Sequence, residues 1–158
     1  MQQENKSKPL AIIFTILSVM CMIAIFYFSA QTADKSAEQS LSILEIIRKI
    51  LGDNSFSDFI VRKAAHFCEF TLLGLLFNFT YYFCKGKQNI ILSTSLASIY
   101  AVSDEIHQIF VDGRACQFRD WVVDTSGAIT GMLVFMLICA IINKVKKSKE
   151  IKNEYTHI

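Results

Sequence analysis

The stretch Leu10–Ala30, LAIIFTILSVMCMIAIFYFSA, decides the fold class, because it runs for 21 residues without a charged side chain. As a helix it would be about 30 Å long, which matches the hydrocarbon core of a bilayer. A cleaved signal peptide fits less well, since its apolar region is typically only about 7–15 residues long and ends at a small-residue cleavage site. We therefore predict a retained membrane-spanning helix.

Three more apolar stretches follow, and each is long enough to cross a bilayer. The chain is 53% hydrophobic and 19% charged, and four such stretches cannot all be buried in a globule of 158 residues. We therefore predict an all-α integral membrane four-helix bundle that forms a single domain over residues 1–158. The predicted spans are about 10–30, 64–84, 89–110 and 121–143.

The distribution of lysine and arginine predicts the direction of these spans. The N-terminal tail, the loop around Lys85 and Lys87 and the C-terminal tail together hold nine lysines against three acidic residues. The two opposite loops, 31–63 and 111–120, each hold equal numbers of basic and acidic residues. Because positive charge accumulates in cytoplasmic loops, we expect both termini to be cytoplasmic.

The longer outer loop contains the pattern of an amphipathic helix at about 40–51. Its apolar residues recur at helical spacing, while Glu45, Arg48 and Lys49 occupy the other face. We expect this extracytoplasmic helix to lie on the outer membrane surface or to cap the bundle.

Charged and polar side chains inside the predicted spans gather at one depth. His66 and Glu69 lie just below the outer start of the second span. Asp104 and His107 lie near the outer end of the third, and Asp124 lies near the outer start of the fourth. Charges inside a membrane are costly and usually functional, so this alignment predicts a polar site in the outer leaflet. The candidate binding residues are Lys63, His66, Glu69, Asp104, Glu105, His107, Gln108, Arg114, Arg119, Asp120 and Asp124.

Two chemistries fit these residues. In the first, the protein is not an enzyme and the cluster binds an amphiphile headgroup, with Arg114 and Arg119 making paired hydrogen bonds to a phosphate or carboxylate. In the second, a divalent metal serves a membrane-embedded hydrolase or transferase that acts on a lipid-linked or phosphate-containing substrate. Glu105 or Asp124 is then the candidate catalytic base. The candidate metal ligands are His66, Glu69, Asp104 and His107.

Further interpretations stay open beside these two. The acids and histidines also suit the proton relay of a transporter, and a purely structural network would use Lys63, Arg114 and Arg119 to neutralise neighbouring acids. Gly127 and Gly131 form a G-x-x-x-G pattern, which favours close packing of the fourth span within the chain or in a homo-oligomer. With a net charge of only +2, no nucleic-acid partner is expected.

Four pieces of the sequence resemble the signature of the VanZ-like family of small bacterial membrane proteins, over about residues 10–143. Residues 28–31, FSAQ, are similar to the family's F-S-x-Q, and residues 63–70, KAAHFCEF, to its K-x-x-H-x-x-E-Y. Residues 103–114, SDEIHQIFVDGR, are similar to its S-D-E-x-H-Q-x-F-x-P-G-R. Residues 120–131, DWVVDTSGAITG, follow its D-x-x-x-[ND]-x-x-G-x-x-x-G. Asp112 stands where the family has proline, and Phe70 where it favours tyrosine.

The resemblance implies a multi-span protein of the bacterial cell membrane. The founding member of the family is linked to low-level resistance to the glycopeptide antibiotic teicoplanin, so the resemblance implies an association with teicoplanin tolerance. The expected partners are the lipid bilayer and either a lipid-linked cell-wall precursor or a lipoglycopeptide.

Overall fold

A computed structural model of the chain describes residues 6–52 and 57–156, and all the regular secondary structure in these residues is helical. This confirms the expected all-α class. The helices are α1 (Lys8–Ser29), α2 (Ala33–Leu51), α3 (Asp58–Lys85), α4 (Ile90–Gln108) and α5 (Phe118–Thr156). The expected spans correspond to α1, α3, α4 and part of α5, and the expected outer helix corresponds to α2.

Three of these helices, α1, α3 and α5, are long and apolar enough to cross a membrane. They support a membrane-embedded protein. The fourth expected span, α4, contains 19 residues, and it carries Asp104 and Glu105 in its last turns together with several serines. These polar residues lower its hydropathy, so a crossing by α4 stays a prediction.

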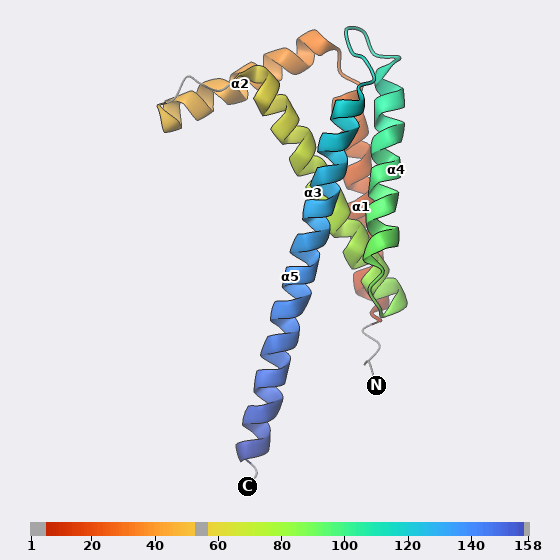
Figure 1. Cartoon of the computed structure of the whole chain (residues 1–158), viewed down its shortest axis with the longest axis vertical. Coiled ribbons are helices and arrows are strands. Elements are labelled where there is room, and N and C mark those ends of the chain that lie inside the picture. Colours follow the sequence, from red (N-terminus) through yellow and green to blue (C-terminus); the bar gives the residue numbers. More distant parts are fainter. Residues whose placement is uncertain (1–5, 53–56, 157–158) are drawn as a thin grey trace.

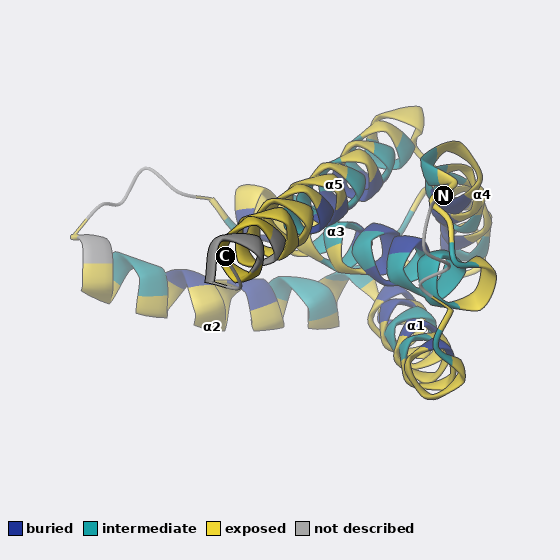
Figure 2. Cartoon of the chain, turned by 90° about the horizontal axis from the view of Figure 1, so that it is seen from below, coloured by how far each residue is buried: buried dark blue, intermediate teal, exposed yellow. Residues whose placement is uncertain are grey.

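The helices run in alternating directions, and α3 lies at their centre. It contacts each of the other four helices. Figure 1 shows that α1 begins and α5 ends at the same end of the molecule, and that α5 extends well beyond its neighbours there. At the opposite end, α2 leaves the group at a steep angle. In Figure 2, which views the molecule from below, α2 lies along one side of the other helices.

The amphipathic helix α2 begins seven residues earlier than the expected start at residue 40. The Thr32 side chain accepts a hydrogen bond from the backbone N–H of Lys35, which caps the first turn. Asp34 lies in that turn, where its negative charge interacts favourably with the helix dipole. Capping and charge therefore start the helix in a segment that has no apolar pattern.

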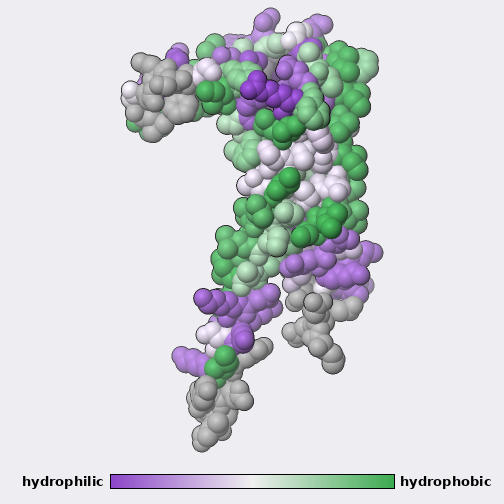
Figure 3. Space-filling view, viewed as in Figure 1, coloured by the Kyte–Doolittle hydropathy of each residue, from purple (hydrophilic) through white to green (hydrophobic). Residues whose placement is uncertain are grey.

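The buried core is small and contains several short side chains. Its central cluster consists of Ile25, Phe70, Leu73, Ala97, Ala101 and Ala128. Large apolar residues instead cover the outside, and on α1 Ile12, Met20 and Ile23 are all exposed. Figure 3 shows this apolar surface as a band between hydrophilic ends on the face in view. Lipid rather than water suits such a surface.

The backbones of α3 and α5 lie in direct contact at their glycines. A Cβ atom added to Gly127 would lie 2.5 Å from the carbonyl oxygen of Phe67, and one added to Gly131 would collide with the carbonyl oxygen of Thr71. On the facing helix, a Cβ added to Gly74 would lie 2.5 Å from the carbonyl oxygen of Ala128. The G-x-x-x-G pair is therefore in contact with α3 of the same chain, as is typical of small residues between membrane helices.

We predict that Gly131→Ala lowers the free energy of unfolding by about 1–3 kcal/mol, the usual cost of overpacking a tight contact. The new methyl group would force α5 away from the Thr71 carbonyl. Thermal unfolding in detergent, followed by the fluorescence of the single tryptophan, Trp121, measures the change. Ser126→Ala on the exposed side of α5 is the control, and equal stability of both variants would contradict the prediction.

Candidate functional site

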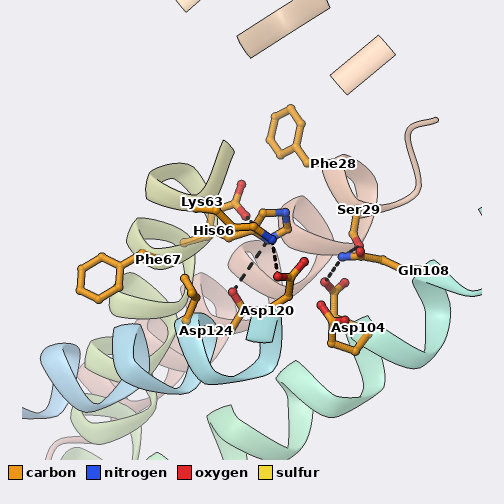
Figure 4. A network of polar contacts seen from close by, with 12 residues as sticks. Phe28, Ser29, Lys63, His66, Phe67, Asp104, Gln108, Asp120 and Asp124 are labelled. Carbon is orange, nitrogen blue, oxygen red and sulfur yellow. Dashed lines mark hydrogen bonds and ion pairs between the residues drawn. The ribbon is translucent and has the colours of Figure 1, made fainter. Parts of the chain in front are cut away.

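The polar residues of four helices meet at the end of the molecule opposite the chain termini. Figure 4 shows Ser29 at the end of α1, His66 on α3, Asp104 and Gln108 on α4, and Asp124 on α5, with their side chains directed toward one another. These helices alternate in direction, so this single end collects the last turns of α1 and α4 and the first turns of α3 and α5.

His66 lies between two carboxylates that come from different parts of the chain. Its Nδ1 atom is 3.8 Å from Oε2 of Glu69 and 4.0 Å from Oδ1 of Asp124. Asp104 completes the group, because one ligand atom from each of His66, Asp104 and Asp124 lies within 4.8 Å of the others. Asp104 is only 2% exposed and Asp124 only 1%. An imidazole and two buried carboxylates of this kind are a donor set that metal ions use.

Gln108 connects Asp104 to the end of α1. Its Nε2 atom donates to Oδ2 of Asp104 at 3.2 Å and to the hydroxyl oxygen of Ser29 at 3.1 Å. All three side chains are buried. The amide therefore fixes the orientation of the Asp104 carboxylate and holds α4 against α1.

Arg114 folds back from the loop between α4 and α5 onto the end of α1. Its Nε atom donates to the carbonyl oxygen of Gln31 at 2.8 Å, and Nη2 donates to that of Phe28 at 3.4 Å. The last carbonyls of a helix lack partners within the helix and carry partial negative charge, so a guanidinium suits them. Gly113 before it has φ +75°, and an added Cβ there would lie 2.9 Å from the Cβ of Ala33. The tight turn and the close approach both require glycine.

Ion pairs and a loop hydrogen bond surround this centre. Lys63 forms an ion pair with Asp120, and Arg62 forms one with Asp58 at 3.2 Å. Oε2 of Glu105 accepts a hydrogen bond from the backbone N–H of Gln117 at 2.8 Å, so this acid is directed toward the loop rather than toward His66. Part of the expected charge neutralisation is thus present, between Lys63 and Asp120.

His107 and Arg119 are among the sequence candidates that lie outside the group formed by His66, Asp104 and Asp124. The ring of His107 stacks on Phe26 with the ring centroids 4.2 Å apart, and its Nε2 atom has no hydrogen-bond partner among the described residues. Arg119 is exposed. Of the two arginines that were expected to bind a phosphate or carboxylate, Arg114 therefore lies at the cluster and Arg119 lies on the surface.

Two cavities adjoin at the cluster. The first, of about 200 Å³, lies beneath α2, and the second, of about 310 Å³, lies beside the loop that precedes α5. Arg62, His66 and Arg114 line both of them. Arg62 was not among the candidate residues. Its position four residues before His66, on the same face of a helix, is the signal that would have identified it.

A comparison with protein families matches the chain to VanZ/LLP1 over residues 14–139. The matched range contains the whole cluster, the Gly113–Arg114 turn and both glycines of α5. Comparisons with curated proteins and with solved structures gave no match. Three helices long enough to cross a membrane and a match that covers most of the sequence agree with the motif resemblance, and the chain belongs to the VanZ/LLP1 family.

Proposed function

We propose that this protein crosses the bacterial cell membrane four times, with both termini in the cytoplasm, and binds the anionic headgroup of an amphiphile in the outer leaflet. The observation that carries the proposal is the pair of adjoining cavities lined by Arg62, His66 and Arg114, at the end away from the termini. A guanidinium binds phosphate or carboxylate through paired hydrogen bonds.

The first cavity combines the two kinds of surface that an amphiphile needs. Apolar side chains of Phe28, Ile43 and Val61 line it together with the guanidinium groups of Arg62 and Arg114. A guanidinium has five N–H donors, so the two carbonyl bonds of Arg114 leave donors for a ligand. An acyl or prenyl chain would contact the apolar side while the acidic group binds the arginines.

The position of α2 supports a site at headgroup depth. Ser36, Gln39 and Ser40 face the first cavity, while Leu41, Ile46 and Ile50 are exposed to the surroundings. A helix with one polar and one apolar face lies in the membrane interface, with its apolar face at the boundary between headgroups and acyl chains. We therefore expect α2 to rest on the outer surface of the bilayer and to cover the cavity there.

The ligand class follows from the combination of acidic group and apolar chain. A lipid-linked cell-wall precursor supplies a phosphate on a long lipid, and a lipoglycopeptide antibiotic supplies an acyl chain beside acidic groups. Binding of either one at the outer surface would alter the action of teicoplanin there. Teicoplanin tolerance is accordingly part of the proposal.

The topology predicts opposite accessibility for two exposed cysteines. Cys116 lies in the loop before α5, and Cys84 lies in the last turn of α3 at the other end of the molecule. In single-cysteine variants, a membrane-impermeant maleimide should label Cys116 in intact cells and Cys84 only after the membrane is opened. The reverse result would overturn the orientation, and labelling of both in intact cells would overturn the crossing by α4.

Loss of one guanidinium should lower the content of bound lipid. For Arg62→Gln and Arg114→Gln we expect about tenfold less of one co-purifying anionic amphiphile, because a charge-assisted hydrogen bond contributes about 1.5–3 kcal/mol. Mass spectrometry of lipids extracted from the detergent-purified protein measures this. Arg119→Gln is the matched control, because this arginine is exposed and lines neither of the two cavities. Equal lipid content in all four proteins would contradict headgroup binding.

Expression of the protein in a susceptible bacterium should raise tolerance to teicoplanin more than tolerance to vancomycin. Teicoplanin carries an acyl chain that a membrane-surface site can contact, whereas vancomycin lacks one. Minimum inhibitory concentrations measured with the wild type and with Arg62→Gln test this directly. An equal change for both antibiotics, or no change, would exclude the antibiotic role for this protein.

A further inference from the structure

We propose that His66, Asp104 and Asp124 form a binding site for one divalent transition-metal ion. The three side chains come from three helices, α3, α4 and α5, and a ligand atom from each lies within 4.8 Å of the others. The site differs from the ligand set expected from the sequence, because Asp124 takes part and His107 stacks on Phe26 instead. This proposal does not depend on headgroup binding.

The first support is a set of buried atoms that lack hydrogen-bond partners. Among the described residues, no hydrogen-bond partner lies within reach of Oδ1 of Asp104, Oδ2 of Asp124 or Nδ1 of His66. Native proteins pair nearly all of their buried polar atoms, and an unpaired one commonly indicates a bound ion or water. Three such atoms from three helices at one place point to a common ligand.

The second support is the charge around the two aspartates. The nearby cations are engaged elsewhere: Lys63 with Asp120, Arg62 with Asp58, and Arg114 with carbonyl oxygens of the α1 end. In the described part of the chain, no lysine or arginine lies within ion-pair distance of Asp104 or Asp124. Two buried carboxylates without an ion-pair partner carry a large desolvation cost, and a divalent ion would supply the missing charge.

The donor set identifies the class of metal. One imidazole and two carboxylates suit Mn²⁺ or Zn²⁺, whereas Ca²⁺ favours oxygen donors alone and Cu⁺ favours sulfur. Neighbouring ligands of one such ion lie about 3–4 Å apart, so the observed separations close with small rotations of the side chains. Glu69 is available as a further oxygen donor, since its Oε2 lies 3.8 Å from the same imidazole nitrogen.

Gln108 orients the ligand on α4. It donates to Oδ2 of Asp104 at 3.2 Å and leaves Oδ1 without a partner. Hydrogen bonds of this kind, made to the atoms of a ligand that do not contact the metal, are a regular feature of metal sites. The Ser29 hydroxyl in turn accepts from Gln108, so the orientation of Asp104 also depends on α1.

The test is metal binding by the detergent-purified full-length protein, measured by calorimetry with MnCl₂ and ZnCl₂ and by bound-Mn²⁺ electron paramagnetic resonance. We expect one ion per chain. Each of His66→Ala, Asp104→Asn and Asp124→Asn should weaken binding at least about tenfold.

Each of these variants has a matched control on the same helix or of the same residue type. His107→Ala, Glu105→Gln and Asp120→Asn remove a neighbouring histidine or acid that lies outside the proposed site, and they should change the affinity by less than about threefold. Loss of binding in the controls that equals the loss in the site variants would overturn the proposal.

Measurements on the wild-type protein alone also test the proposed metal site, and they do not depend on whether a variant folds. Metal should raise its unfolding temperature, followed by the fluorescence of Trp121, and a chelator should reverse the rise. If the wild type binds neither ion more tightly than about 100 µM, the proposal is wrong and protons neutralise the two aspartates instead. Loss of lipid binding in Arg62→Gln with metal binding intact would separate this site from the headgroup site.

Discussion

The direct contact between the backbones of α3 and α5 sets the geometry of the whole polar site. Gly127 lies against the carbonyl of Phe67, which is the residue after His66, and Asp124 lies one turn before Gly127. The same contact that brings the helices together therefore brings Asp124 to His66. With a larger residue at Gly127 the helices would separate, and the imidazole would lose its neighbour on α5. Packing and chemistry in this protein depend on the same turn of helix.

The depth of the polar residues could be predicted from the sequence, but their directions could not. Counting from the ends of the apolar stretches placed His66, Asp104 and Asp124 in one layer, because helix rise is constant. Spacing alone did not decide whether Asp104 or Glu105 faces inward, since that depends on the rotation of α4 against its neighbours. His107 was expected in the cluster, and its partner Phe26 lies on a helix far away in sequence, where no local pattern reveals it. The early start of α2 was missed because capping by Thr32, not apolar periodicity, begins that helix.

The structural role of residues 28–31, at the end of α1, is evident only in the folded structure. In the sequence, residues 28–31 are a short match to a family pattern with no evident chemistry. In the structure, the Ser29 hydroxyl accepts from Gln108, and the carbonyls of Phe28 and Gln31 accept from Arg114. The segment is thus a junction where residues of α4 and of the following loop attach to α1. The Ser29 hydroxyl and the carbonyls of Phe28 and Gln31 position two residues that face the site, and the Phe28 side chain lines the first cavity.

The attachment of Arg114 has a mechanical consequence for the cavity beneath α2. The loop that carries this arginine also accepts a hydrogen bond from the first residue of α2, through the Asp112 carbonyl and the Ala33 N–H at 3.2 Å. An anion bound in the cavity would use the N–H donors of Arg114 that the carbonyls of Phe28 and Gln31 leave free, so this arginine would hold the ligand while it stays attached to the end of α1. The loop of Arg114 thus ties the end of α1 to the start of α2, and a ligand held by this arginine lies beside the corner from which the cover of the cavity begins.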